Sequence, residues 1–554
     1  MRKSLALTLG LLSAALLAGC ATPVPVEPVK VRVLAINDFH GNLRPARGGI
    51  RIADPANPGK TMNVDAGGAE HLATAVAELR KGHANHVFVA AGDLIGATPL
   101  LSALFRDEPT IESLSLMGLE ISAVGNHEFD KGADELLRLQ RGGCHPGDGC
   151  KGPQPFKGAS FQYLAASTVV EKTGQTLLPA YQIKRFQGVP VAFIGLTLEA
   201  TPSIVVAEGV AGLKFRNEAQ TVNELVPQLR RQGVEAIVVL IHEGGMPVGD
   251  YNECPGISGP IVDIVKKLDK AVDLVISGHT HRAYNCRIDG RLVTSGDKYG
   301  TIVTAIDLVL DPKTRDITSA VADNVIVRPS FAKDPVQTAL IEQYERLVVP
   351  LAKRVVGRIG AALPREGNNA GESPLGQVIA DAQLAATRAP QDGGAQVAFM
   401  NPGGIRAGLS MPADGLVRYE DLFAVQPFYN NLVTLTLSGA QLLELLEAQW
   451  KGQVGSGRVL HVSSGFSYSW DAARPLGERV VPGSVRLNGQ PLAASDNVRV
   501  TVNAFVAGGG DNFAIFKQGR DVRTGMMDVD ALEAYVKSNP TVAPGALNRI
   551  TRLN

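Results

Sequence analysis

The chain has 554 residues, in which 54 Lys and Arg balance 54 Asp and Glu, so its formal net charge is zero. This length predicts two or more domains, because a domain usually has about 100–200 residues. A neutral chain lacks the broad basic surface that binds nucleic acid, so we expect no nucleic-acid partner, although a small anion is not excluded.

The first 30 residues are predicted to direct export. Two basic residues precede an apolar run that is too short to span a bilayer, which is the pattern of a secretory signal peptide over 1–19. The ending Leu17–Cys20 resembles a bacterial lipobox, in which Cys20 is lipidated and becomes the mature N-terminus. An ordinary signal peptide with a chance Cys is the alternative. Residues 20–30 contain three Pro and predict an extended tether, and Ala21 favours the periplasmic face of the outer membrane.

Four Cys would remain after this processing, and an even number in an exported chain predicts disulfides. Cys144 and Cys150 bracket a Gly- and Pro-rich loop, so of the three possible pairings we expect Cys144 with Cys150 and Cys254 with Cys286. A metal site is the alternative, but neither pair has the spacing of zinc ligands.

The first half of the chain contains separated apolar runs that read as buried strands: 31–38, 87–93, 121–128, 191–197, 236–243 and 273–281. Helical patterns fall between several of them, at Glu70–Lys81, Pro99–Met117 and Gln220–Gln232. Alternation of strands and helices predicts an α/β domain over 31–332 with both faces of its sheet covered.

The pattern changes at residues 333–356, where apolar residues at helical spacing predict a connecting helix. Residues 357–554 then have the length of a further domain. It begins with a helical pattern at Pro374–Arg388 and continues with strand-like runs at 396–401, 431–438 and 497–504, which predicts an α+β domain.

Polar residues end five of the first-half strands: Asp38 and His40, Asp93, Asn126 and His127, His242, and His279 and His281. Ligands of α/β sheets bind beyond the carboxyl ends of strands, and alternation along a strand would put residues i and i+2 on one face. A single His at such a place is explained by a turn, but five of the ten His fall there. Imidazole and carboxylate together are ligands for transition metals. The set is too large for one ion, and two ions about 3.5–4 Å apart are typical of phosphoryl transfer.

These motifs, in this order and spacing, resemble the five motifs of the calcineurin-like metallophosphatases. The string GNHEFDKG at 125–132 resembles the bacterial 5′-nucleotidase branch, which includes periplasmic UDP-sugar hydrolases and 2′,3′-cyclic nucleotide phosphodiesterases. The resemblance covers nearly all of the mature chain. It implies an α/β-β-α metallophosphatase sandwich, joined by a linker helix to an α+β substrate-binding domain.

The resemblance also implies a dinuclear site with two divalent ions, Zn, Mn, Co or Fe. One ion would have the ligands Asp38, His40, Asp93 and His281. The other would have Asp93, Asn126, His242 and His279, so that Asp93 bridges, together with a water or hydroxide. Some members have Gln in place of His281. By the same resemblance His127 faces the phosphoryl oxygens and Asp130 holds its other ring nitrogen.

In the second half, Asn401–Arg406 resembles the NxGGIR loop of the family, with Pro402 as a departure. The resemblance implies these contacts with substrate: Phe428 and Phe505 around the base, Asn430 and Gly465 at the base edge, Asp511 on the ribose hydroxyls, and Arg406 on the phosphate. Arg365 is the only match to a further phosphate-side arginine.

We therefore expect a phosphoric monoester hydrolase in which a metal-bound hydroxide converts a 5′-nucleotide to nucleoside and phosphate. UDP-sugars and 2′,3′-cyclic nucleotides are alternative substrates of the same site. A dimanganese sulfur-oxidation hydrolase is disfavoured by the paired Phe residues, and a non-catalytic surface nucleotide-binding lipoprotein is disfavoured by His127. We expect a monomer, membrane contact only through the lipid, and a hinge near Lys353–Gly360.

Overall fold

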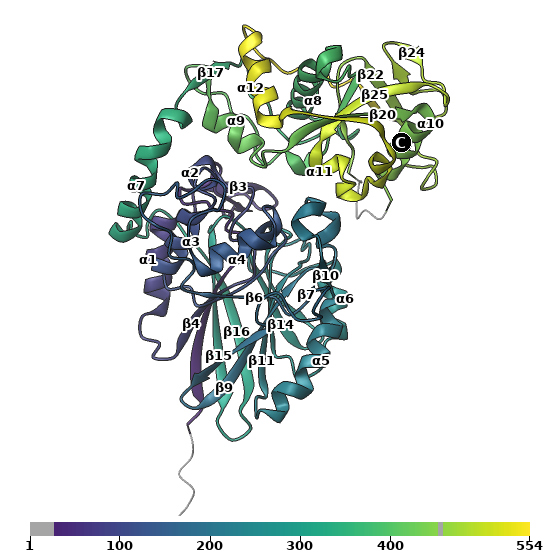
Figure 1. Cartoon of the computed structure of the whole chain (residues 1–554). Helices are drawn as coiled ribbons and strands as arrows, with labels where there is room; N and C mark the ends of the chain where they lie inside the picture. Colours follow the sequence, from purple (N-terminus) through teal and green to yellow (C-terminus); the bar gives the residue numbers. More distant parts are fainter. Residues whose placement is uncertain (1–26, 452–457) are drawn as a thin grey trace, which may run out of the picture.

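The structure is a computed structural model that describes residues 27–451 and 458–554. The predicted signal peptide, Cys20 and most of the tether lie outside the described residues. Figure 1 shows an N-terminal domain below and a C-terminal domain above, connected at one side by helix α7 (Pro335–Ala352).

Two six-stranded sheets form the N-terminal domain. The first has the strand order β16 (Asp316–Ile326), β15 (Ile302–Asp311), β1 (Val29–Ile36), β4 (His86–Ala90), β5 (Ile121–Ala123) and β6 (Gln162–Leu164). The second has the order β13 (Ala283–Ile288), β14 (Arg291–Gly296), β12 (Leu274–Ser277), β11 (Ala236–His242), β9 (Val189–Thr197) and β8 (Tyr181–Phe186). Two further antiparallel pairs join β2 (Ile50–Ala53) with β3 (Thr61–Val64) and β7 (Thr168–Val170) with β10 (Leu213–Phe215).

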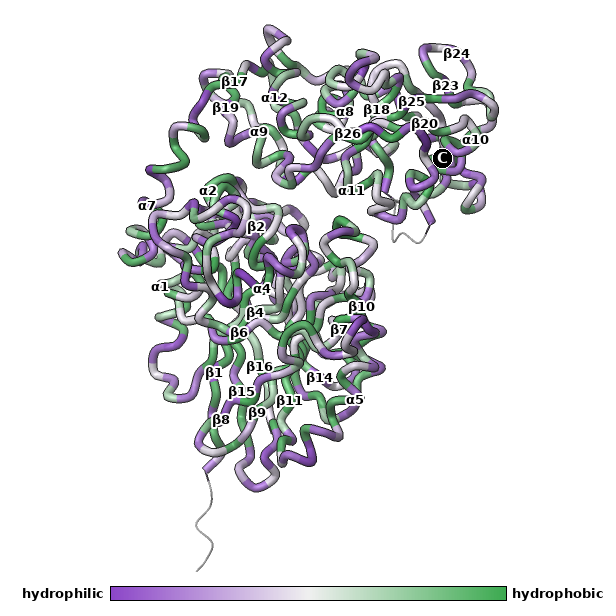
Figure 2. The backbone as a smooth tube through the Cα atoms, in the orientation of Figure 1, coloured by the Kyte–Doolittle hydropathy of each residue, from purple (hydrophilic) through white to green (hydrophobic). Residues whose placement is uncertain are grey.

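The two large sheets pack face to face, because their strands are apolar on both sides. One buried cluster holds Val33 and Val89 from the first sheet together with Phe193 and Val238 from the second. The outer faces are covered by helices: α1 (Ala69–Arg80), α3 (Glu108–Leu116) and α4 (Ala133–Arg141) on the first sheet, and α5 (Glu218–Arg231) and α6 (Pro260–Lys267) on the second. The prediction of an α/β-β-α sandwich is confirmed. Figure 2 shows hydrophobic residues along these strands and hydrophilic residues in the outer loops.

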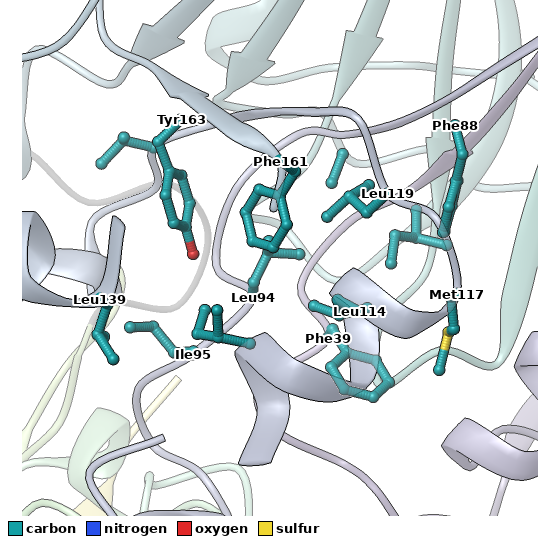
Figure 3. Close-up of a cluster of buried hydrophobic side chains, with 14 of the residues drawn as sticks. Phe39, Phe88, Leu94, Ile95, Leu114, Met117, Leu119, Leu139, Phe161 and Tyr163 are labelled. Atoms are coloured by element: carbon teal, nitrogen blue, oxygen red, sulfur yellow. The ribbon is translucent and has the colours of Figure 1, made fainter. Parts of the chain in front are cut away.

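The hydrophobic cluster under α3 reaches the end of strand β1. Phe39 is fully buried and belongs to the same hydrophobic cluster as Leu114, Met117 and Phe88, which Figure 3 labels. Its two chain neighbours are Asp38 and His40, so the core holds the backbone that carries both polar side chains.

The prediction of a single helix at Pro99–Met117 is wrong, because a turn divides this segment into two helices. The structure has a short helix α2 (Leu100–Ala103) and then α3, with Arg106 and Asp107 between them at φ of 54° and 64°. Left-handed residues cannot continue a right-handed helix, so the chain turns there.

Helix α7 connects the domains and packs against the N-terminal one. Asp334 caps its first turn, Gln337 is bonded to Ser113, and the hydroxyl of Tyr344 donates to Glu112 over 3.0 Å. Strand β17 (Val355–Arg358) follows within the segment where we expect a hinge, and the hinge itself stays a prediction.

The C-terminal domain is built on a five-stranded and a four-stranded sheet. The first has the order β21 (His461–Val462), β18 (Val397–Met400), β25 (Asn497–Asn503), β20 (Asn431–Ser438) and β26 (Arg520–Met527). The second has the order β24 (Gln490–Pro491), β23 (Arg486–Leu487), β22 (Phe466–Trp470) and β27 (Ile550–Arg552), and β17 pairs with β19 (Leu416–Arg418). The helices are α8 (Pro374–Thr387), α9 (Tyr419–Val425), α10 (Gly439–Ala448), α11 (Ala504–Ala507) and α12 (Asp528–Ser538). This is the α+β domain that the sequence predicts.

Two disulfides join Cys144 to Cys150 and Cys254 to Cys286. In the part of the chain that the structure describes, no helix is both long and apolar enough to cross a membrane.

A buried histidine makes the stability of the C-terminal domain depend on pH. His461 is 3% exposed, neither ring nitrogen has a hydrogen-bond partner among the residues that the structure describes, and a side chain at Gly376 would collide with the ring. Burial lowers the pKa of His461 to about 4 from 6.5. As the pH falls below about 6.5 the unfolded chain gains this proton and the folded domain does not, so stability is lost between about pH 6.5 and pH 4.

We therefore expect His461→Gln to reduce the pH dependence of unfolding. Between pH 7 and pH 5, the wild-type chain should lose about 2 kcal/mol of unfolding free energy through this residue, and the variant should not. Denaturant unfolding at both pH values checks this, with His83→Gln as the control. An equal loss in wild type and His461→Gln would contradict it.

Candidate functional site

The seven predicted metal ligands lie together at one edge of the two large sheets. Each follows or ends a strand: Asp38 and His40 follow β1, Asp93 follows β4, Asn126 follows β5, His242 ends β11, and His279 and His281 follow β12. The pairs β1–β4–β5 and β9–β11–β12 are parallel, so these carboxyl ends meet at the same edge.

Their side-chain atoms form two adjoining groups. In the first, His281 Nε2 lies 3.2 Å from Asp38 Oδ1 and 3.2 Å from His40 Nε2. In the second, His242 Nε2 lies 2.9 Å from Asp93 Oδ2, and His279 is close enough to share an ion with both. The groups touch where His40 Nε2 lies 3.7 Å from Asp93 Oδ2.

The backbone at the site is left-handed at five ligands, and this corrects the expectation of strand alternation. Asp38 and His40 have φ of 50° and 46°, Asp93 has 51°, and His279 and His281 have 70° and 53°. Asp38 and His40 reach the same group of ligands because each lies in the loop beyond strand β1, whereas His279 and His281, in the loop beyond β12, reach different groups. Such conformations cost about 1–3 kcal/mol each and gather at functional sites.

Backbone carbonyls orient two of the imidazoles. His40 Nδ1 donates to the carbonyl of Gly96 over 2.7 Å, and His242 Nδ1 donates to that of Ala91 over 2.8 Å. Each ring thereby presents Nε2 to the cluster, which is the usual outer-sphere arrangement of metal-binding histidines.

Glu128 supports the site, and the sequence motifs alone do not predict this role. Its buried carboxylate accepts from the backbone N–H of Asp93, Leu94 and Gly125 at 3.0, 2.8 and 2.6 Å. It thus ties the loop after β4 to the loop after β5. Its place in the GNHE string was the available signal.

Glu128→Gln is expected to destabilise these loops, because an amide has one acceptor oxygen for three donors. We expect the free energy of unfolding to fall by about 1–3 kcal/mol, together with weaker metal retention. Thermal unfolding and metal content after dialysis measure the two effects. Glu78→Gln on the exposed face of α1 is the control, and equal behaviour of the two variants would contradict the role of Glu128.

The residues present fit divalent cations. The carboxylates of Asp38 and Asp93 are buried, and among the described residues their only cationic partners are histidines. Asn126 Oδ1 is buried in the same place, and no described residue donates a hydrogen bond to it. Two buried carboxylates and an unpartnered amide oxygen beside imidazoles are a ligand set for transition metals.

The protonation states agree with this set. Burial lowers the pKa of His40, and it lowers that of His279 to about 3, so both rings are neutral as a ligand requires. Burial would also lower the pKa of His242, but the charges of Asp93 and Asp38 outweigh it and raise the pKa to about 10. A cation that competes for the same lone pair would displace that proton.

His127 lies beside the cluster and is held by Asp130. His127 Nδ1 and Asp130 Oδ2 are 2.7 Å apart, and the His127 ring is 5.0 Å from that of His40. Burial would lower the pKa of His127, but the carboxylates of Asp130 and Asp93 outweigh it, so the net shift is upward. The ring therefore favours the charged form with both nitrogens protonated.

The C-terminal domain reaches this site through Phe428 and Arg406. The Phe428 ring stacks on His127 at 5.7 Å with an interplanar angle of 19°, and Arg406 Cζ lies 5.8 Å from the centre of the Phe428 ring. A small cavity of about 40 Å³ next to His127 is lined by Asp130, Phe428 and Tyr429, so residues of both domains enclose it.

The remaining predicted substrate residues lie elsewhere in the C-terminal domain. Phe505 packs so closely on Gly510 that any side chain there would collide with its ring, and Asp511 comes next in the chain. The carbonyl of Asn430 accepts a hydrogen bond from the backbone N–H of Asp528, and that of Gly465 accepts one from Asn488. The contact of Asn430 and Gly465 with a base edge stays a prediction.

Arg365 supports the loop that carries Arg406. Its Nη1 donates to the carbonyls of Ile405 and Arg406 at 3.0 and 2.7 Å. The structure thus gives Arg365 a supporting contact in addition to the predicted phosphate contact.

Comparison with known proteins matches both domains. Residues 31–283 match the model of the calcineurin-like phosphoesterases, and residues 354–518 match that of the 5′-nucleotidase C-terminal domain. The solved structure of a 5′-nucleotidase precursor from Thermus thermophilus superposes with a TM-score of 0.75 at 26% identity, covering 95% of this chain and 99% of that one.

Two curated relatives are longer proteins. The chain is 34% identical over 519 residues to the endonuclease YhcR of Bacillus subtilis, which covers 93% of this chain and 40% of that protein. It is 29% identical over 564 residues to the cell wall protein Lmo0130 of Listeria monocytogenes, covering 96% and 70%. The chain thus spans less than half the length of the first of these relatives.

Proposed function

The chain belongs to the calcineurin-like metallophosphatases that carry a C-terminal 5′-nucleotidase domain, a family of metal-dependent phosphoesterases, and from this membership we propose that it is a phosphoric monoester hydrolase that converts 5′-nucleotides to nucleoside and phosphate. The observation that carries the proposal is the stacking of Phe428 on His127. It brings an aromatic side chain of the C-terminal domain against the residue beside the metal cluster, so one molecule with a phosphate and a base can contact both domains.

In this proposal two divalent cations occupy the two groups of ligands. Asp38, His40 and His281 would hold one, Asn126, His242 and His279 would hold the other, and Asp93 would be a ligand shared by both. When bound, the cations supply a water-derived nucleophile at neutral pH and neutralise the phosphoryl charge. Zn, Mn, Co and Fe all suit such imidazole-rich ligands.

The protein groups around the cluster position and stabilise the phosphoryl group. His127 faces its oxygens through Nε2, and Asp130 keeps a proton on Nδ1 by accepting it in a hydrogen bond. Arg406 adds a second positive charge on the side of the C-terminal domain. Donors that are fixed before the reaction stabilise the charge that builds up in the transition state without reorganising.

The C-terminal residues hold the leaving nucleoside. Phe428 and Phe505 stack on the base, and Asn430 and Gly465 contact its edge. Asp511 accepts hydrogen bonds from the ribose hydroxyls. Stacking tolerates any base and contributes roughly 1–3 kcal/mol per base in nucleic-acid complexes, so we expect little discrimination between bases.

We extend the proposal to the location of the protein: it is exported and anchored by a lipid on Cys20. Metabolic labelling with a radioactive fatty acid should label the wild type and not Cys20→Ala. Labelling of both, or of neither, would contradict the anchor.

A phosphate-release screen tests the proposed substrate. The purified protein is supplied in turn with each divalent metal and with 5′-nucleotides, UDP-glucose, 2′,3′-cyclic AMP and bis(p-nitrophenyl) phosphate. We expect the highest kcat/KM for 5′-monophosphates. A higher value for UDP-glucose or 2′,3′-cyclic AMP would replace the 5′-nucleotide by that substrate at the same site.

A further inference from the structure

An arginine pairs with the carboxylate that we place at the ribose. Arg458 Nη1 donates to Asp511 Oδ1, and the side chains of Arg458 and Asp511 are 39% and 9% exposed. The pair joins Arg458, which lies just before β21, to Asp511 in the turn at Gly510–Asn512, 53 residues further along the chain.

Both oxygens of Asp511 are engaged. Oδ1 accepts from Arg458, and Oδ2 accepts from Asn401 Nδ2 over 2.7 Å. Asn401 in turn accepts from Asn503 Nδ2 over 2.9 Å, and Asn503 caps α11. The carboxylate is therefore held in place from one side by a buried amide network and from the other by a guanidinium.

Most N–H groups of the Arg458 guanidinium have no hydrogen-bond acceptor among the described residues. An arginine has five N–H groups, and among the described residues the Arg458 side chain donates only to Asp511. The remaining donors belong to a partly exposed group with a fixed charge, which is the chemistry that binds a phosphate.

The position of this pair is next to the proposed nucleoside. Phe505 packs on Gly510, the neighbour of Asp511, and Gly403 faces Asp511 from the Asn401–Arg406 loop. The far end of that loop carries Arg406 toward Phe428 and the metal cluster. In the proposed function the 5′-phosphate lies at the cluster, the base on Phe505 and the ribose hydroxyls on Asp511, so a group on the 2′ or 3′ oxygen would come next to Arg458.

We propose that Arg458 forms an anion subsite at the ribose edge, so that the enzyme accepts nucleotides with an additional phosphate on the 2′ or 3′ oxygen. This inference rests on the proposed function. A lone Asp511 carboxylate would repel such a phosphate, whereas the Arg458–Asp511 pair is neutral and offers to it the guanidinium donors that no described residue engages. The substrate class is therefore nucleoside 3′,5′-bisphosphates as well as 5′-monophosphates.

The test compares kcat/KM for adenosine 3′,5′-bisphosphate and AMP, by phosphate release, in wild type, Arg458→Gln and Arg458→Lys. We expect Arg458→Gln to lower the bisphosphate-to-AMP ratio at least tenfold, as for the loss of a hydrogen bond to a charged group. Arg458→Lys should lower it less, because the charge remains. Arg520→Gln, at the exposed start of β26, is the matched control and should leave the ratio unchanged.

Binding gives a second reading that does not need turnover. With chelator-treated protein, the ratio of Kd values for the two nucleotides should shift by the same factor in Arg458→Gln. An equal loss for both nucleotides would mean that Arg458 only positions Asp511, and it would overturn the subsite. Absence of hydrolysis of every nucleotide would instead overturn the proposed function, and the Kd ratio would still decide for or against Arg458.

Discussion

Replacement of Asp93 by Asn is expected to lower kcat/KM for a 5′-nucleotide by more than about 100-fold. Loss of a residue that only supports a metal ligand lowers activity by about 10–100-fold, and loss of a ligand that two ions share should exceed that range. Asp93 is the residue that both groups of ligands share, since Oδ2 lies 2.9 Å from His242 Nε2 and 3.7 Å from His40 Nε2. Asparagine keeps the shape but removes the negative charge between two cations, so both ions should be held more weakly. Steady-state phosphate release and metal content after dialysis measure the two consequences.

Asp273→Asn is the matched control for this experiment. Asp273 is a largely buried aspartate of the same domain whose carboxylate accepts from the backbone of Ile237, at the opposite end of the strands. Burial raises the pKa of Asp273 to about 8, so the neutral amide is a close substitute there and should leave activity unchanged. Full activity of Asp93→Asn would show that the chemistry does not depend on a shared metal ligand.

Replacement of His127 by Ala is expected to lower kcat by about 10²–10³-fold, the range for removing one fixed donor to a developing negative charge. KM should change less, because the donor acts mainly in the transition state. Asp130→Asn should cost less, about 10–100-fold, because Asp130 acts through the 2.7 Å contact with His127 Nδ1.

The double variant His127→Ala/Asp130→Asn separates these roles. If Asp130 acts only through His127, the double variant should be no slower than His127→Ala alone. Additive losses would contradict that assignment. Metal content adds a further check, because His127 also lies near enough to His40 and Asp93 to share an ion with them. We expect His127→Ala to keep two ions, and the loss of one would make His127 a ligand.

The position of the site was predictable from the sequence for a simple physical reason. Each candidate ligand directly follows a buried apolar run, and parallel strands place their carboxyl ends at one edge. Asp93 and His242 therefore meet although 149 positions separate them, without any local pattern that links the two.

The backbone conformation and the long-range contacts that hold the site residues in place could not be predicted in the same way. The left-handed backbone of Asp38 and His40 has no periodic pattern, because it arises from turns that the surrounding core imposes. The three backbone bonds of Glu128 and the Arg458–Asp511 pair are single long-range contacts. Composition and spacing carry no signal for such contacts, since each depends on how two loops meet after folding.

A metal titration followed by phosphate release tests the central claim most directly. Chelator-treated protein is titrated with Mn²⁺ or Zn²⁺, and phosphate release from AMP is measured at each step. We expect no release without metal and a rise in rate that ends at two ions per chain. Release from the metal-free protein, or a rate that is complete at one ion per chain, would contradict a dinuclear nucleotidase.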